Sequence, residues 1–282
     1  MPSTALNPAE VAGYRRDGYH FPVRVIPEAE ALALRRRLEA FEAIEGKPLA
    51  GNYRHKVHLL FPWAWELIHR PEILDAVESV IGPDILSWST TFFIKEARDP
   101  GFVSWHQDST YWGLSSPDVI SAWVALSPAT VESGAMRVIP GTHGVQVGHR
   151  DTYDPRNLLS RGQEIEVEVD QSKAVDMVLA PGEMSLHHVR LFHGSEPNRS
   201  ADRRIGFAIR YIPTYVKQTI DRDGAVLVRG TDRYRHFDME PRPDSDLSTA
   251  ALAAHRAAAE RSARILYLGA RKQSFEPAGG AM

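Results

Sequence analysis

The pattern of hydrophobic and polar positions changes once along the chain, close to Pro83. Before that residue, apolar side chains recur at helical spacing in three segments that begin at Asn7, Pro27 and Pro71. Asn7 followed by proline is typical of the first turn of a helix. We therefore expect N-terminal helices over about residues 7–82.

After Pro83 the apolar residues occupy every second position, in short segments bounded by Gly, Pro and Asp. Roughly seven or eight such segments follow one another with no helical pattern between them. This succession is typical of an antiparallel jelly roll or barrel. We expect a mainly β fold with flanking helices, a double-stranded β-helix (cupin-like jelly roll), whose β core covers about residues 84–216.

Composition narrows the class of protein. The chain has 282 residues, of which 43% are hydrophobic and 24% charged, as in ordinary globular domains. A formal charge of -3 gives no electrostatic case for nucleic acid or an anionic membrane as partner. No residue is cysteine, which excludes disulfides, iron–sulfur clusters and cysteine nucleophiles, so a metal must take nitrogen and oxygen ligands. Without a signal-peptide pattern or an apolar stretch of membrane-spanning length, we expect a cytoplasmic protein.

The segment His106-Gln107-Asp108 is a candidate half of a metal site. Two residues separated by one on a strand point to the same face, so His106 and Asp108 can face a barrel interior together. The same triplet form occurs at His149-Arg150-Asp151 and His236-Phe237-Asp238. Spacing alone therefore leaves open that His106 and Asp108 are merely polar residues of a strand.

A third ligand is available among His187, His188 and His193. Two histidines and one carboxylate form the facial triad of non-haem iron sites, which leaves metal positions open. We favour His193, because the Gly194-Ser195 pair after it is typical of backbone that crowds a pocket.

Arg204 follows on the next strand pattern, where it can return to the side of His193. A buried guanidinium requires an anion. A dicarboxylate that chelates iron at one end and meets Arg204 at the other would supply it. The alternative is that Arg204 pairs with Asp202 or Glu196 on the surface.

Together these features resemble the phytanoyl-CoA dioxygenase family of Fe(II)- and 2-oxoglutarate-dependent oxygenases, over roughly residues 10–216. The blocks that carry the likeness are HQDSTYW, AWVAL, GAMRVIPGTH, PGEMSLHH and HGSEPNRSADRRIGFAIRY. The resemblance implies that His106, Asp108 and His193 bind iron and that Arg204 binds the distal carboxylate of 2-oxoglutarate.

Further roles are implied by the same resemblance. Ser195 would join Arg204 at the distal carboxylate, and Trp123 would lie along the co-substrate. Lys56, with Lys95 as its competitor, and Thr91 would also reach that ligand. His188 would face the substrate, with a histidine of the core as the alternative.

The resemblance implies hydroxylation of an unactivated C–H bond of a small-molecule metabolite, with O2 consumed and succinate and CO2 released. Related halogenases lack the carboxylate that Asp108 provides, so its presence favours an oxygenase outcome. The alternative is a jelly-roll metal enzyme that does not use 2-oxoglutarate, such as a cupin-type isomerase or dioxygenase, which would have no use for Arg204. The substrate and the oligomeric state are not indicated by the sequence.

The last part of the chain is rich in Arg, Asp, Gly and Pro over residues 217–247 and returns to a helical pattern over 248–268. We expect 217–247 to be either a lid over the substrate entrance, with Arg229 or Tyr234 contacting substrate, or a solvated loop. With no internal repeat or linker, residues 1–282 are expected to form one oxygenase domain.

Overall fold

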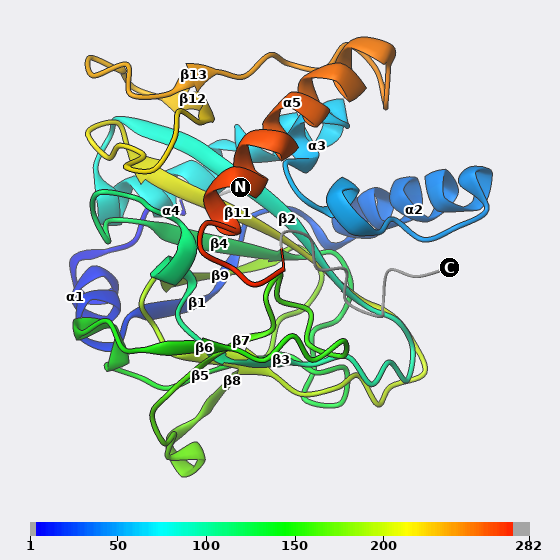
Figure 1. Cartoon of the computed structure of the whole chain (residues 1–282). Helices are drawn as coiled ribbons and strands as arrows, with labels where there is room; N and C mark the ends of the chain where they lie inside the picture. Colours follow the sequence, from blue (N-terminus) through cyan, green and yellow to red (C-terminus); the bar gives the residue numbers. More distant parts are fainter. Residues whose placement is uncertain (1–3, 273–282) are drawn as a thin grey trace.

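Two facing β-sheets form the centre of the protein, and the computed structural model describes residues 4–272 of it (Figure 1). The larger sheet has seven strands, which pair antiparallel except for the last two. In spatial order its strands are β1 (Tyr19–Arg24), β9 (Glu183–His188), β4 (Ile120–Ala125), β11 (Arg204–Pro213), β2 (Ile85–Lys95), β12 (Gly224–Arg229) and β13 (Asp238–Met239).

The smaller sheet lies below the larger one in Figure 1 and has four strands. Its order is β3 (Val103–His106), β10 (His193–Ser195), β5 (Met136–Val138) and β8 (Val175–Met177), and a separate pair is formed by β6 (His149–Asp151) and β7 (Gln163–Ile165). Residues of both sheets share one apolar cluster, in which Trp123 and Ala208 meet Met136 and Val138. The expected jelly roll is confirmed.

Helices cover the outer face of the larger sheet. They are α1 (Pro8–Asp17), α2 (Glu28–Glu45), α3 (Pro62–Ile68) and α4 (Pro71–Ile81), while α5 (Thr249–Leu266) runs from the top of Figure 1 towards its middle, and its Leu252 packs against the same core. Leu38 of α2, Trp63 of α3 and Val77 of α4 belong to the main hydrophobic core together with Phe207 of β11.

Strand β11 shows how the sheet separates two environments. Its odd-numbered residues Ile205, Phe207, Ile209 and Tyr211 belong to the core beneath the helices. Side chains alternate between the faces of a strand, so the even-numbered residues from Arg204 to Arg210 face the smaller sheet. All ten residues of the strand are buried, which makes the two guanidinium groups unusual.

The expected helices are confirmed, as is the cap of the first. The Asn7 side chain accepts from the backbone N–H groups of Ala9 and Glu10, and Glu10 accepts from the N–H of Asn7 at 2.8 Å. Gly18 ends that helix with φ 83°, a left-handed conformation that glycine adopts at little cost.

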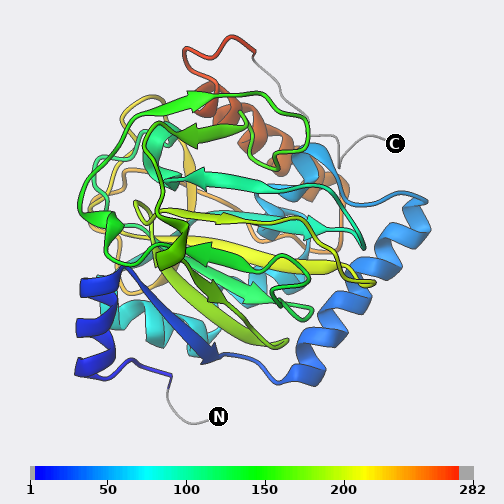
Figure 2. The same ribbon diagram turned by 90° about the horizontal axis from the view of Figure 1, so that it is seen from below.

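The pattern of apolar residues missed β1 and β12. Strand β1 lies inside the segment expected to be helical, and it pairs with β9 at the edge of the larger sheet, between α1 and α2 (Figure 2). Strand β12 lies inside the segment 217–247, which we expected to be irregular, and it pairs with β2. Each has only six residues, which is too short for a distinct period beside charged neighbours.

Within residues 4–272, the helices are all too short or too polar to cross a membrane.

Candidate metal centre and adjoining cavities

Three side chains converge between the two sheets, as the sequence predicted. His106 ends β3, His193 begins β10, and the two residues are direct partners across the antiparallel pair, with ring centroids 4.0 Å apart. Asp108 Oδ1 lies 3.3 Å from His106 Nε2 and 3.9 Å from His193 Nε2. One ligand atom from each of the three residues lies within 4.8 Å of the others, and all three residues are buried.

Hydrogen bonds orient both imidazole rings for metal binding. The Nδ1 atom of His106 lies 2.9 Å from the carbonyl oxygen of Ser104, and Nδ1 of His193 lies 2.9 Å from that of Leu191. A carbonyl only accepts, so the proton is assigned to Nδ1 and each Nε2 presents a lone pair towards Asp108. This is the usual arrangement of metal-binding histidines. Two imidazole nitrogens and a carboxylate fit iron(II).

Asp108 reaches the site from a turn and not from a strand. Strand β3 stops at His106, and Asp108 begins the short 3-10 helix η3 (Asp108–Tyr111). Its backbone N–H donates to the carbonyl of Val189 at 2.9 Å, which holds the turn against the chain before His193. The prediction that the pair alternates along a strand is wrong in its geometry, although both side chains do face the same space.

The environment keeps these groups in the protonation states that a metal requires. Burial lowers the pKa of His193 well below its usual value, so the ring is neutral. Burial by itself would raise the pKa of Asp108, but the neighbouring His106, His193 and Arg210 hold it well below its usual range.

The structure separates the three candidate histidines. On β9 the alternation of side chains places His187 on the inner face, with Nε2 4.0 Å from Asp108 Oδ2, and burial lowers its pKa to about 4. His188 points away, where its Nδ1 accepts from the N–H of Arg190 at 3.1 Å and its ring lies beside His143. His187 is therefore the β9 histidine that lines the cavity of the triad; His188 does not line it, and its contact with substrate stays a prediction.

Arg204, Ser195 and Trp123 line the same cavity as the triad, as predicted. The Arg204 guanidinium lies 5.3 Å from the centre of the Trp123 ring and donates through Nη1 to the carbonyl of Gly134 at 2.6 Å. Its Nε has no hydrogen-bond partner, and burial lowers its pKa to about 10. The surface alternative, pairing with Asp202 or Glu196, does not occur: Asp202 pairs with Arg35.

Of the two candidate lysines, Lys95 is the one beside this cavity. Its Nζ donates to Ser195 Oγ at 2.7 Å, and burial lowers its pKa to about 6. Lys56 is equally buried, but its Nζ donates to Glu240 Oε1 at 2.9 Å and to two backbone carbonyls. The structure thus places Lys56 in a separate ionic cluster and does not bring it to Arg204.

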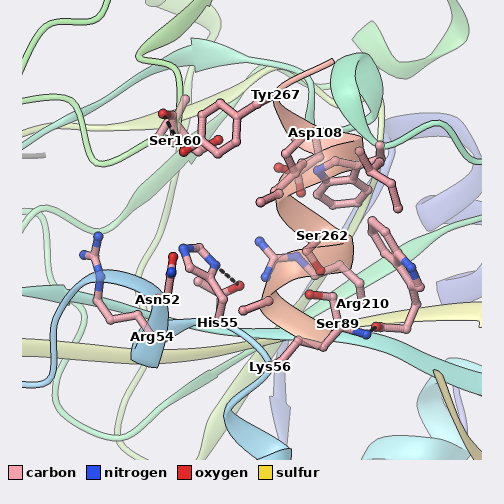
Figure 3. A pocket seen from close by; sticks show the side chains of 18 of the residues that line it. Asn52, Arg54, His55, Lys56, Ser89, Asp108, Ser160, Arg210, Ser262 and Tyr267 are labelled. Atoms are coloured by element: carbon pink, nitrogen blue, oxygen red, sulfur yellow. Dashed lines mark hydrogen bonds between the residues drawn. The ribbon is translucent and has the colours of Figure 1, made fainter. Parts of the chain in front are cut away.

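A second cavity adjoins the metal site and shares Phe93, Asp108 and Arg210 with it. Figure 3 shows its lining, in which Asn52, Arg54 and His55 come from the segment after α2, and Ser262 and Tyr267 come from α5 and the residues after it. Thr91 lines this cavity and not the one around Arg204; its Oγ1 lies 3.4 Å from His55 Nδ1.

The segment 217–247 does not form the wall that the lid hypothesis requires. Of its residues, only Asp223 lines the second cavity, whose outer wall is built instead by α5. Arg229 forms ion pairs with Asp75 and Glu78 of α4. Tyr234 is exposed and stacks on His236. Neither Arg229 nor Tyr234 lines either cavity, and their contact with substrate stays a prediction.

Comparison with known proteins agrees with this geometry. Residues 14–206 match the family described as phytanoyl-CoA dioxygenase (PhyH). A solved structure described as a non-heme monooxygenase, ThoJ apo, is 37% identical with a TM-score of 0.80, over 92% of this chain and 97% of that one. CytC3 with Fe(II) and alpha-ketoglutarate is 27% identical with a TM-score of 0.66, over 87% of this chain and 97% of that one.

Curated sequences agree as well. L-proline trans-4-hydroxylase of Streptomyces griseoviridis is 24% identical over 223 residues, which cover 70% of this chain and 83% of that protein. The alignment with another curated relative covers only 54% of that relative's length.

The matched segment includes His106, Asp108, His193 and Arg204, and it makes up well over half of the chain. Members of the matched family depend on Fe(II) and 2-oxoglutarate and act with O2 on small molecules. The chain belongs to the phytanoyl-CoA dioxygenase family of Fe(II)- and 2-oxoglutarate-dependent oxygenases.

Proposed function

We propose that the protein hydroxylates an unactivated C–H bond of a small-molecule metabolite. His106, Asp108 and His193 bind iron(II), and Arg204 binds the distal carboxylate of 2-oxoglutarate. The observation that carries this proposal is one cavity lined by the three ligands and by a buried guanidinium whose Nε lacks a partner. When bound, iron with 2-oxoglutarate and O2 supplies the oxidation, in which one oxygen atom enters the C–H bond while 2-oxoglutarate becomes succinate and CO2.

The chain's own residues bind and orient the co-substrate in this proposal. The Arg204 guanidinium can donate two parallel hydrogen bonds to a carboxylate, and the Trp123 ring covers one side of the guanidinium. Ser195 presents its hydroxyl to the same end of the cavity, where Lys95 holds it. Lys95 is thus a positioning residue, since its hydrogen bonds go to Ser195 and to the carbonyl of Glu196.

The second cavity is assigned to the substrate. It opens onto the triad through Asp108, and its remaining walls are built by the segment after α2 and by α5. A molecule in it would meet the metal on the side away from Arg204. Because Asp108 supplies the carboxylate ligand, we assign hydroxylation and not halogenation as the outcome.

The test is succinate release with iron(II) and 2-oxoglutarate across a panel of small metabolites, with product detected by mass. A substrate whose mass increases by one oxygen, in step with succinate, supports the proposal. Metal-dependent turnover that continues without 2-oxoglutarate would favour the alternative, a jelly-roll isomerase or dioxygenase of another kind. The cytoplasmic location and the single domain over 1–282 stay predictions from the sequence.

A further inference from the structure

Arg210 is a buried cation that has no ion pair within residues 4–272. Its side chain lies on the inner face of β11 and is 6% exposed, and its Nε and Nη1 atoms have no hydrogen-bond partner. Among residues 4–272 no carboxylate forms an ion pair with it. The rings of Phe93 and Trp112 lie against the guanidinium, each with its centroid 5.5 Å away.

Its position distinguishes Arg210 from Arg204. Both face inwards on β11, but Arg204 lines only the metal cavity, whereas Arg210 lines the metal cavity and the adjoining cavity. Six residues of strand separate their Cα atoms by about 20 Å. The two cations therefore lie at opposite ends of the inner face, on either side of the small residues Gly206 and Ala208.

The carboxylates that line the two cavities with Arg210 are committed elsewhere. Asp108 belongs to the triad. Asp223 accepts from Trp88 Nε1 at 2.7 Å and from the N–H of Gly224 at 2.8 Å. A buried cation without a counter-ion is costly, and an anion that enters the cavity removes that cost. A guanidinium matches a carboxylate with two parallel hydrogen bonds.

Arg54 is the other buried arginine of this cavity, and it fits the role less well. It is 7% exposed, its Nε has no hydrogen-bond partner, and it does not line the metal cavity. An anion on Arg54 would lie on the wall away from the triad. An anion on Arg210 would hold its carbon skeleton beside Asp108, where the reaction takes place.

We propose that the substrate carries a carboxylate and that Arg210 binds it, between the faces of Phe93 and Trp112. This inference rests on the assignment of the adjoining cavity to the substrate. It defines the substrate class as small carboxylic acids, amino acids included, and it makes Arg210 the residue that selects them. An acyl thioester, whose carboxyl group is no longer free, would lack the group that Arg210 recognises.

The test is calorimetric binding to the full chain loaded with Ni(II) and 2-oxoglutarate, which avoids turnover. The probes are the straight-chain acids from propionate to decanoate and the common amino acids, each compared with its own primary amide. We expect at least one acid to bind on the order of tenfold or more tighter than its amide. Arg210→Met should abolish the difference in affinity between acid and amide. Arg210→Lys, which keeps the charge but cannot donate two parallel hydrogen bonds, should reduce that difference.

The matched control is Arg229→Met, because Arg229 forms ion pairs with Asp75 and Glu78 and lies outside both cavities. It should keep the preference for acids. The proposal is overturned if the unaltered protein prefers no acid over its amide, or if the preference survives Arg210→Met or disappears in Arg54→Met. It is also overturned if Arg210→Met weakens 2-oxoglutarate as strongly as Arg204→Met does.

Failure of the proposed function would appear separately, in the loading step. If Ni(II)-loaded protein does not bind 2-oxoglutarate, the family chemistry assigned to the site is wrong. If loading succeeds and no acid is preferred, only the role of Arg210 is wrong. The comparison in the unaltered protein needs no variant, so it holds even if Arg210→Met does not fold.

Discussion

The two faces of β11 carry different kinds of residue. The face towards the helices has Ile205, Phe207, Ile209 and Tyr211, which belong to the main hydrophobic core. The face towards the smaller sheet has Arg204, Gly206, Ala208 and Arg210; three of these, Arg204, Ala208 and Arg210, line the metal cavity, and Arg210 also lines the adjoining cavity. One strand thus contributes to stability with one face and to binding with the other.

This comparison explains why two arginines are buried in a strand at all. Apolar area on the helix side stabilises the fold enough to tolerate unpaired cations on the inner side. The cost of those cations is removed when anionic ligands bind. Substitutions on the helix face should therefore lower stability, and substitutions on the inner face should weaken binding.

The largest effect is expected at the triad, opposite the inner face. Asp108→Ala and His193→Ala should abolish stoichiometric iron binding, because within residues 4–272 His106, Asp108 and His193 are the one group whose ligand atoms lie close enough together to hold a metal. The loss of iron affinity should exceed the about 10–100-fold that is usual when a residue hydrogen-bonded to a metal ligand is replaced. Iron content after anaerobic loading measures it.

The neighbouring histidines of β9 are the controls for that prediction. His188→Ala should leave iron content unchanged, because the ring faces away from the cavity. His187→Ala should also retain iron. Loss of iron in His187→Ala with full retention in His193→Ala would show that the wrong histidine has been assigned.

On the helix face, Phe207→Ala should lower the free energy of unfolding by about 3–5 kcal/mol, as for other buried aromatic residues. Phe207 is fully buried and its ring lies 5.2 Å from that of Phe92 and 6.5 Å from that of Trp63. Urea unfolding measures the loss. Folded Phe207→Ala protein should bind 2-oxoglutarate with the affinity of the unaltered chain. Weaker binding by the folded variant would contradict the division of β11 into a stabilising face and a binding face.

On the inner face, Arg204→Met should weaken 2-oxoglutarate binding by about 2–5 kcal/mol, which is at least about tenfold. Stability without ligand should be unchanged or increased, because an unpaired buried charge is removed. Isothermal calorimetry and urea unfolding of the same preparation give both values. A large loss of stability with unchanged binding would assign Arg204 to the core.

A smaller effect is expected at Gly206, where a side chain would enter the space of the Trp123 ring. An added Cβ would lie 1.7 Å from Trp123 Cζ2, so the ring must move. Gly206→Ala should cost about 1–3 kcal/mol of stability and also weaken 2-oxoglutarate. Ala208→Gly on the same face should leave Trp123 in place, and fluorescence of the tryptophans can compare the two variants.

The smallest effect is expected outside both faces, at the two residues of the segment 217–247 for which a lid and a solvated loop are the alternatives. Arg229→Met should change stability by no more than about 1 kcal/mol, as for a partly exposed ion pair. Tyr234→Ala should change it less, because Tyr234 is exposed. Neither should change turnover; a substantial fall in turnover in either variant would restore the lid hypothesis.

The sequence predicted those parts of the site that depend on residue type and strand period. Residue type and spacing indicate His106, Asp108, His193 and Arg204, whereas Ser195 and Trp123 follow only from the resemblance to the family. The turn that carries Asp108 was not predictable, since it depends on a hydrogen bond to Val189, far along the chain. The register of one strand against its neighbour is set by tertiary contacts, so the local sequence does not reveal it.

The missed residues have the same explanation. Arg210 lies three steps of two residues from Arg204 along β11, so the alternation of side chains places both on the same face. The local sequence does not show that Arg210 lacks a counter-ion. The choice between Lys56 and Lys95 depends on which carboxylate each one meets, and Glu240, the partner of Lys56, lies 184 residues away. The role of α5 as a wall was hidden because a helix pattern shows only that one face is buried, and not what covers it.

The most direct test of this account is 2-oxoglutarate binding by anaerobic calorimetry, with and without iron(II), in the unaltered chain and in Arg204→Met. The account predicts tight binding only when iron(II) and Arg204 are both present, with one site per chain and at least about tenfold weaker binding when either is missing. Equal affinity in metal-free protein, or in Arg204→Met loaded with iron, would contradict the assignment of this inner face as the site of an iron- and 2-oxoglutarate-dependent oxygenase.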